Sequence, residues 1–230
     1  NRNEWLQLIV RIAVARYIKT GEETDVSDAL LRLFDEKIYA NLDKVALHDA
    51  DAFRARCCYT EPVSLALKRH TESLKSLFIV YADIRAAGGK VKVSMKSLES
   101  TMLLGLGELF ELINDLHMLD ECLTRRHVIF AFVQSRMHVV EEDKPKSRRK
   151  VANLAFEDFL EFIVRIAVMK ALPTDEEINC SGRLDAGDFI LELKQDPAKY
   201  SEFVRTHACK IDEVPLQRVE CCVEHLLSLI

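Results

Sequence analysis

The sequence has few of the residues that interrupt regular backbone structure. Only seven of its 230 residues are glycine and five are proline, which favours long regular elements with short breaks. No apolar run approaches the ~18 residues expected of a membrane span, and no secretory signal peptide is visible at the start. Because residue 1 is Asn and not Met, we expect the natural start of the protein to lie upstream.

The sequence also has no net positive charge and no recognisable catalytic signature. The net charge of −5 argues against a broad nucleic-acid surface, which is usually basic. The sequence has no nucleophile-elbow, Walker or dinucleotide-binding glycine pattern, so we expect no enzyme, no nucleic-acid partner and no membrane partner. The seven cysteines are odd in number and include two adjacent pairs, which is untypical of a secreted disulfide framework. Free, buried thiols in a reducing cytosol are expected instead.

What the chain does contain is an internal repeat. Ile9–Val14 and Ile163–Val168 have the same six residues, at an offset of 163 − 9 = 154. Glu61–Val63 and Glu213–Pro215 form a looser second correspondence, at an offset of 213 − 61 = 152. These recurrences predict about one and a half copies of a single ~152–154-residue module. A chain built in this way usually works by assembly or binding rather than by chemistry.

The apolar periodicity predicts an all-α fold. Trp5, Leu8 and Ile12 follow one helical stripe and predict a helix over residues 4–17. Start signals predict further helices at 26–40 (capped by Asp25 or Ser27), at 63–82 (Pro62 in the first turn) and after the capping box of Thr174 and Glu177. Other helices are expected at 96–104, 107–117, 125–139, 156–171 and 215–229. Residues 91–93 and 153–155 are the only strand candidates, enough for one short two-stranded ribbon.

The segment Leu154–Leu160 resembles the junction between an EF-hand loop and its exit helix, where a hydrophobic residue precedes an aromatic residue, an acid and Phe. The resemblance implies EF-hand-like helix pairs. The first hand would comprise helix 63–82, loop 83–95 and helix 96–104; the second would comprise helix 125–137, loop 137–154 and the helix after it. Residues 1–60 would be the C-terminal part of a module (exit helix plus linker helices), 61–171 one EF-hand-like pair, and 172–230 a partial second copy of the linker and entering helix.

The two loops lack the ligands that calcium requires. An EF-hand loop supplies oxygen ligands from its first, third and fifth positions and a bidentate acid from its last. The corresponding residues are Asp83, Arg85, Ala87 and Ser94 in the first loop, and Ser147, Arg149, Val151 and Asp158 in the second. Because arginine at a ligand position repels a divalent cation, we expect no calcium and no other cofactor.

Repeated, degenerate EF-hand pairs resemble the EF-hand-repeat proteins of cilia and flagella, a group that includes microtubule inner proteins. The resemblance implies a non-enzymatic structural protein of the axoneme, in the cytoskeleton of a cilium or flagellum. Its partners would be tubulin in the lumen of the doublet microtubule, other axonemal proteins and neighbouring copies joined head to tail. The alternative is a calcium-sensor or adaptor domain that regulates a partner protein.

Candidate partner-binding residues lie at both ends of the chain and in one basic run. Trp5 is the counterpart of Phe159 and is either a core anchor or an interface anchor. Head-to-tail assembly would bring the first helix against the last one, using Trp5, Ile9, Leu226, Leu229 and Ile230. The basic run 144–150, with Lys146, Arg148 and Arg149, either contacts acidic tubulin or is a solvated loop whose charge is offset by Glu141, Glu142 and Asp143.

Two further residue sets carry weaker expectations. Cys221 and His225 have the i, i+4 spacing of zinc ligands, with His207 and Cys209 nearby in sequence. No C-x-x-C pair is present and Cys221 and Cys222 point to different faces, so we expect buried thiols, a surface histidine and no zinc. Arg11 and Arg165 recur at matched positions inside apolar helices, and both guanidinium groups are expected to be exposed at a helix edge.

Overall fold

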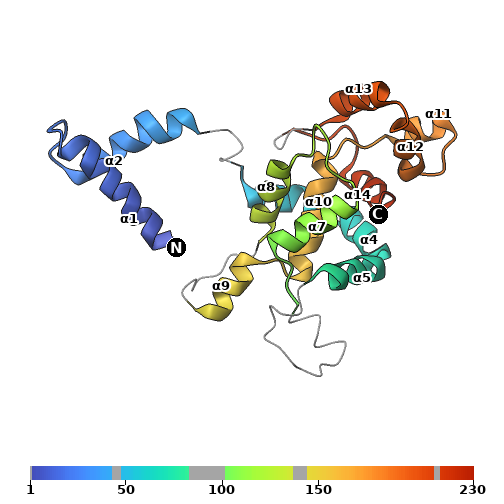
Figure 1. The fold of residues 1–230 in the computed structure, drawn as a ribbon, viewed down its shortest axis with the longest axis horizontal. Coiled ribbons are helices and arrows are strands. Elements are labelled where there is room, and N and C mark those ends of the chain that lie inside the picture. The colour runs from blue at the N-terminus through green and yellow to red at the C-terminus, as the bar shows by residue number, and fades with distance from the viewer. Residues whose placement is uncertain (1, 43–47, 83–101, 137–143, 210–212) are drawn as a thin grey trace. The chain divides into compact units, whose positions relative to one another are not determined.

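The computed structural model describes residues 2–42, 48–82, 102–136, 144–209 and 213–230 (Figure 1). Across these ranges the regular structure is helical apart from one isolated bridge, which confirms the expected all-α class. The chain divides into two compact units, which we call unit 1 (1–48) and unit 2 (49–230).

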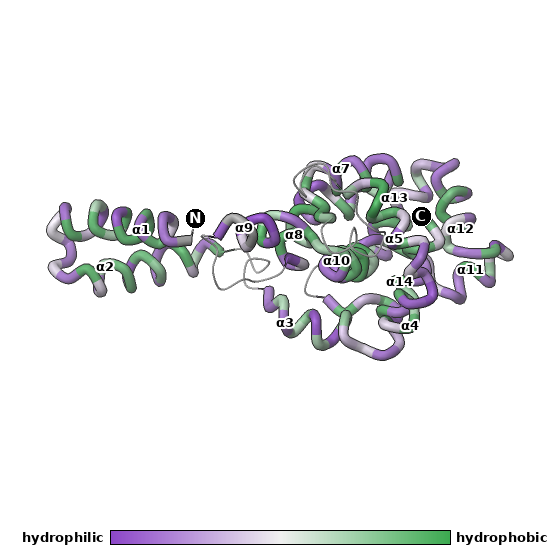
Figure 2. The backbone as a smooth tube through the Cα atoms, turned by 90° about the horizontal axis from the view of Figure 1, so that it is seen from below, coloured by the Kyte–Doolittle hydropathy of each residue, from purple (hydrophilic) through white to green (hydrophobic). Residues whose placement is uncertain are grey.

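Unit 1 is a helical hairpin. Its elements are α1 (Arg2–Ala13), the π-helical turn η1 (Val14–Ile18), α2 (Val26–Leu33), the π-helical turn η2 (Phe34–Ile38) and the 3-10 turn η3 (Tyr39–Asn41). Asp25 caps α2 by accepting a 2.7 Å hydrogen bond from the Ser27 N–H, as the sequence predicts. α1 and α2 lie side by side (Figure 2), and a small core of Ala13, Tyr17, Ala29 and Leu33 joins them.

Unit 2 contains the larger core. Its helices in chain order are α3 (Ala50–Phe53), the π-helical turn η5 (Arg54–Cys58), α4 (Glu61–Arg69), α5 (Thr71–Tyr81), α7 (Leu106–Asp115), α8 (Arg125–Ser135), α9 (Pro145–Ala152), α10 (Phe156–Met169), α11 (Asp175–Ser181), α12 (Ala186–Leu193), α13 (Pro197–His207) and α14 (Val219–Leu227). Pro62 lies in the first turn of α4, and Thr174 and Glu177 form the predicted capping box of α11.

Helix α10 is the centre of unit 2. It is predominantly hydrophobic (Figure 2) and packs against α14, α8, η5 and α5. Phe159 is fully buried and continues a run of ring contacts from Phe78 to Phe162, with centroids 5.5 and 6.4 Å from its own. Aromatic residues dominate core burial, so these rings fix how α5 and α10 approach one another.

A single antiparallel bridge joins Leu104 to Leu154. The Leu104 N–H donates to the Leu154 carbonyl at 2.9 Å, and the Leu154 N–H donates back at 2.8 Å. The expected helix over 96–104 is therefore wrong at its described end, because a backbone paired across a bridge cannot form helical hydrogen bonds. Of the strand expected at 153–155, only Leu154 is paired, in the isolated bridge with Leu104. Residues 91–93 lie outside the described ranges.

The C-terminal helices pack onto the same unit. α14 contacts both α10 and α4, and α12 contacts α14. A satellite core of Ala171, Ile190, Phe203 and Val204 holds α12 and α13 together. The segments 61–171 and 172–230 both lie within unit 2, and unit 1 ends at His48.

Candidate interaction surfaces

The place expected for the second EF-hand loop is occupied by helix α9. Ser147, Arg149 and Val151, the first three would-be ligand positions, all lie on this helix, so they do not line a coordination loop. The fourth, Asp158, accepts a 3.0 Å hydrogen bond from the Ala155 N–H and caps α10. Burial raises the pKa of Asp158, which also disfavours the ionised form that calcium needs. Asp83, Arg85, Ala87 and Ser94 lie outside the described residues.

Helix α9 carries a basic surface. Arg148, Arg149 and Lys150 are exposed, and none of the three has a carboxylate partner in the described part of the chain. Two side chains cap the C-terminal end of the helix. Asn153 Nδ2 donates to the Arg149 carbonyl at 2.7 Å, and Arg136 Nη1 donates to the Val151 carbonyl at 2.9 Å. These bonds satisfy carbonyls that a helix end leaves without partners. The side chain of Lys146 is not described.

Arg136, the residue after α8, lies against the C-terminal end of α9. Its guanidinium lies over the Phe132 ring, 5.6 Å from the centroid, and its Nε is buried with no hydrogen-bond partner among the described groups. Burial lowers the pKa of Arg136, as expected for a cation removed from water without an anion beside it. No local sequence pattern points to this residue.

The two copies of the repeated hexapeptide lie in opposite environments. In α10, Ile163 is 2% exposed and both Val164 and Ile166 are 0% exposed. In α1, Val10 is 39% and Ile12 is 41% exposed. The same six residues are therefore packed on all sides in unit 2 and on one side in unit 1.

The matched arginines differ in the same way. Arg165 is 2% exposed, so its expected exposure is wrong, whereas Arg11 is exposed as expected. Glu161 explains the difference: its Oε1 accepts from Arg165 Nε at 2.9 Å, and its Oε2 accepts from Arg54 Nε at 2.8 Å. The Arg165 guanidinium also covers the Phe53 ring at 4.2 Å.

The Arg54–Glu161–Arg165 triad ties η5 to α10. Burial opposes the charged form of Arg54, but hydrogen bonds to Glu161 and Asp51 outweigh it and raise the Arg54 pKa. Buried charges need charged or hydrogen-bonding partners, and the carboxylate of Glu161 accepts hydrogen bonds from both guanidinium groups. In α1 the residue matching Glu161 is Gln7, which carries no charge.

A second buried ion pair lies at the end of α10. Lys170 Nζ contacts the Asp120 carboxylate and donates to the Met118 carbonyl at 2.9 Å. The Tyr200 hydroxyl donates to the same carboxylate at 3.0 Å. Burial alone would raise the pKa of Asp120, but the Lys170 charge and the hydrogen bonds outweigh it and lower that pKa. These contacts connect three segments that are distant in sequence, at Asp120, Lys170 and Tyr200.

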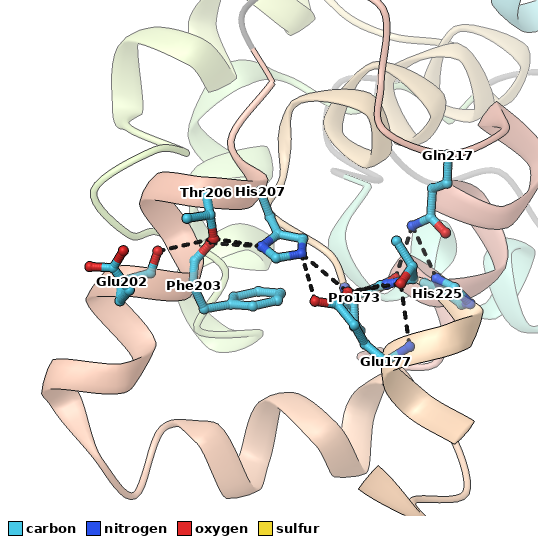
Figure 3. Close-up of polar contacts among 9 residues, drawn as sticks. Pro173, Glu177, Glu202, Phe203, Thr206, His207, Gln217 and His225 are labelled. Carbon is cyan, nitrogen blue, oxygen red and sulfur yellow. Dashed lines mark hydrogen bonds and ion pairs between the residues drawn. The ribbon is translucent and has the colours of Figure 1, made fainter. Parts of the chain in front are cut away.

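The histidines near the C-terminus are held by carboxylates. His207 Nε2 lies 2.9 Å from Glu177 Oε1, and its Nδ1 lies 3.1 Å from the Phe203 carbonyl oxygen (Figure 3). His225 Nε2 lies 2.9 Å from Asp175 Oδ1, with Gln217 at its other nitrogen. Among the described residues no three His, Cys, Asp or Glu side chains are placed to hold a metal ion. His207, Cys209, Cys221 and His225 are thus not assembled as a ligand set.

The residues expected to bind partners are only partly at the surface. Trp5 is 54% and Ile230 is 41% exposed, and Arg148 and Arg149 are exposed on α9. Ile9 packs against the core of unit 1. Leu226 is 0% exposed, so in this structure it holds α14 in the core and is not presented to another chain. Leu229 is half-buried and packs against the satellite core.

None of the described helices is both long and apolar enough to cross a membrane. No family model, no curated protein and no solved structure matches the chain.

Proposed function

We propose that this chain is a non-enzymatic structural protein of the ciliary or flagellar axoneme. In this proposal it binds the doublet microtubule and neighbouring copies through EF-hand-like helix pairs that do not need calcium. The observation that carries the proposal is the antiparallel bridge between Leu104 and Leu154. Each of the two leucines comes shortly before a helix, α7 and α10 respectively, in the arrangement by which paired EF-hands join their loops.

The second support is the basic helix α9, which lies where the EF-hand resemblance puts the second loop. Where an EF-hand would present carboxylates to a cation, α9 presents Arg148, Arg149 and Lys150 to solvent. Because tubulin is acidic, such a surface suits it better than it suits a divalent ion. The third support is the repeated helix, which fits a protein that uses one packing unit more than once along its length.

The proposal is tested by co-sedimentation with purified doublet microtubules. The variant carries Arg148→Gln, Arg149→Gln and Lys150→Gln together. If each charge contributes about 0.5 kcal/mol, as exposed pairs do, the apparent affinity falls about tenfold, and its dependence on salt concentration weakens.

The matched control carries Arg183→Gln, Lys199→Gln and Arg205→Gln. These exposed residues are already paired with Glu192, Asp196 and Glu202, and the control changes the net charge by the same amount. An equal loss of affinity in both variants would show that the net charge, and not the surface of α9, determines binding. Absence of saturable binding by the unmodified chain would refute the proposal. Binding that requires calcium would favour the sensor or adaptor alternative.

A further inference from the structure

A small cavity lies in unit 2, between α12 and the C-terminal ends of α7, α10 and α14. Its volume is about 180 Å³. An apolar cavity of about 150 Å³ already holds one benzene molecule, so this cavity has room for a single ring of that kind. Most of its wall is apolar and is formed by Leu116, Met118, Ile190, Leu191 and Leu229.

The titratable residues that line the cavity are two lysines and a histidine, and none of its lining residues is acidic. Lys170 is the buried one, with a side chain that is only 4% exposed. Its ammonium group contacts the Asp120 carboxylate and donates to the Met118 carbonyl at 2.9 Å. An ammonium group has three N–H donors, so one has no acceptor among the groups that the structure describes. A buried donor without an acceptor costs free energy, and an acceptor in the cavity can supply it.

Lys194 gives the cavity a second positive charge. It follows the last turn of α12, is exposed, and has no carboxylate partner in the described part of the chain. Its Nζ lies over the Tyr200 ring, 5.7 Å from the centroid. Burial lowers the pKa of Lys170, Asp120 opposes this shift, and the charge of Lys194 adds to it. Asp120 therefore balances only one of the two lysines, which leaves one positive charge in excess.

His117 occupies a backbone position that usually belongs to glycine. Its φ of 48° is left-handed, a conformation that glycine adopts freely and that strains a residue with a side chain. The His117 N–H donates to the Asn114 carbonyl at 3.0 Å, and the Met118 N–H donates to the Ile113 carbonyl at 3.1 Å. These two bonds form a Schellman motif at the end of α7. The strained position thereby places an imidazole, in addition to the two ammonium groups, in the lining of the cavity.

We propose that this cavity binds a small apolar monocarboxylate. Its carboxylate would accept hydrogen bonds from Lys170 and Lys194, and its hydrocarbon body would lie against the apolar wall. One negative charge matches the one uncompensated lysine, and the volume admits a single ring or a short branched chain. A mostly apolar pocket with a few polar groups that orient the ligand is typical of small-molecule sites. The site goes beyond the proposed function, because it involves neither α9 nor the bridge between Leu104 and Leu154.

Benzoate is the probe, because it carries one carboxylate on one ring. Benzyl alcohol and benzylamine have the same ring with a neutral and a positively charged group. Binding of each compound to the full chain is measured by isothermal titration calorimetry at constant ionic strength. We expect saturable binding of benzoate, with a dissociation constant on the order of 0.1–1 mM for a ligand of this size. Benzyl alcohol and benzylamine should bind at least tenfold more weakly.

Two variants separate loss of the site from loss of the fold. Lys194→Gln removes the exposed charge and should weaken benzoate binding about fivefold. The matched control Lys199→Gln, at an exposed lysine of α13 paired with Asp196, should leave it within about twofold. His117→Gly should weaken benzoate binding but raise the melting temperature of unit 2 without ligand, because glycine relieves the left-handed strain. A loss of fold cannot produce these two opposite changes together.

The absence of saturable benzoate binding would overturn the proposal and leave the two lysines with only the role of stabilising the negative ends of α10 and α12. Binding of benzyl alcohol or benzylamine as tight as that of benzoate would also overturn it. So would equal effects of Lys194→Gln and Lys199→Gln, or an unchanged affinity for benzoate in His117→Gly. Co-sedimentation with doublet microtubules is measured separately, so a failure of this site is distinguishable from a failure of the proposed function.

Discussion

Exchanging glutamate and glutamine at the matched positions of α10 and α1 tests whether the Glu161 carboxylate stabilises unit 2. Glu161→Gln gives α10 the residue that α1 has at position 7, and Gln7→Glu makes the reverse change. In α10 the carboxylate of Glu161 accepts hydrogen bonds from Arg165 at 2.9 Å and from Arg54 at 2.8 Å. The side chains of Arg165, Glu161 and Arg54 are only 2%, 10% and 12% exposed. A glutamine amide of the same shape keeps one acceptor but turns an N–H group toward an arginine.

The expected loss in unit 2 is large. Breaking a buried ion pair by removing one partner costs about 3–5 kcal/mol, and the retained amide acceptor places Glu161→Gln near 3 kcal/mol. At about 3 °C per kcal/mol for a unit of this size, the melting temperature of unit 2 falls by about 9 °C. Gln7→Glu creates only an exposed i, i+4 pair with Arg11, which stabilises unit 1 by about 0.3–0.5 kcal/mol.

Urea unfolding separates the two effects, because urea does not screen charges. Circular dichroism follows the helices of both units, whereas the fluorescence of Trp5 reports on unit 1. Glu161→Gln should lower the midpoint of the unit 2 transition and leave the Trp5 transition unchanged. A midpoint shift for Glu161→Gln no larger than that for Gln7→Glu would refute the conclusion that the triad holds α10 and η5 together.

Further predictions concern the C-terminal part of unit 2. Gly187→Ala should destabilise unit 2 by about 1–3 kcal/mol, because an added Cβ would lie 2.5 Å from the Ser228 carbonyl oxygen. The control Gly107→Ala, with nothing within 4 Å of its Cβ, should be neutral or stabilise α7 by up to about 1 kcal/mol. Thermal unfolding measures both variants, and equal melting temperatures would contradict the close approach of α12 to α14. Asp120→Asn should cost about 3 kcal/mol at neutral pH by leaving Lys170 buried without its anion. Because the pKa of Asp120 is lowered in the fold from 3.8, its stabilisation is present above that pH and is lost as the pH falls through the folded-state value; an unchanged acid limb of the stability profile in Asp120→Asn would contradict this assignment.

The sequence predicted those features that depend on neighbouring residues. Asp25, Pro62 and the Thr174–Glu177 capping box marked helix starts correctly, since capping acts within one turn. The stripe of Trp5, Leu8 and Ile12 likewise indicated a helix, although the pattern could not say whether that helix would be covered.

Features that join distant segments could not be predicted in the same way. Arg54 and Glu161 are 107 positions apart, and no local pattern shows that a charged residue in an apolar helix has such a partner. The helix expected to end at residue 104 was wrong for a related reason, because Leu104 pairs with Leu154 and tertiary pairing overrides local propensity. Helix α9 was expected as a loop because its run of like charges is typical of a solvated loop, but lysine and arginine also have high helix propensity.

The proposed function requires that the chain bind the doublet microtubule as a structural element that does not respond to calcium. Its most direct test is co-sedimentation of the full chain with purified doublets, measured in parallel in calcium and in a calcium chelator. We expect saturable binding with the same affinity in both conditions. No binding in either condition, or binding in only one of them, would contradict it.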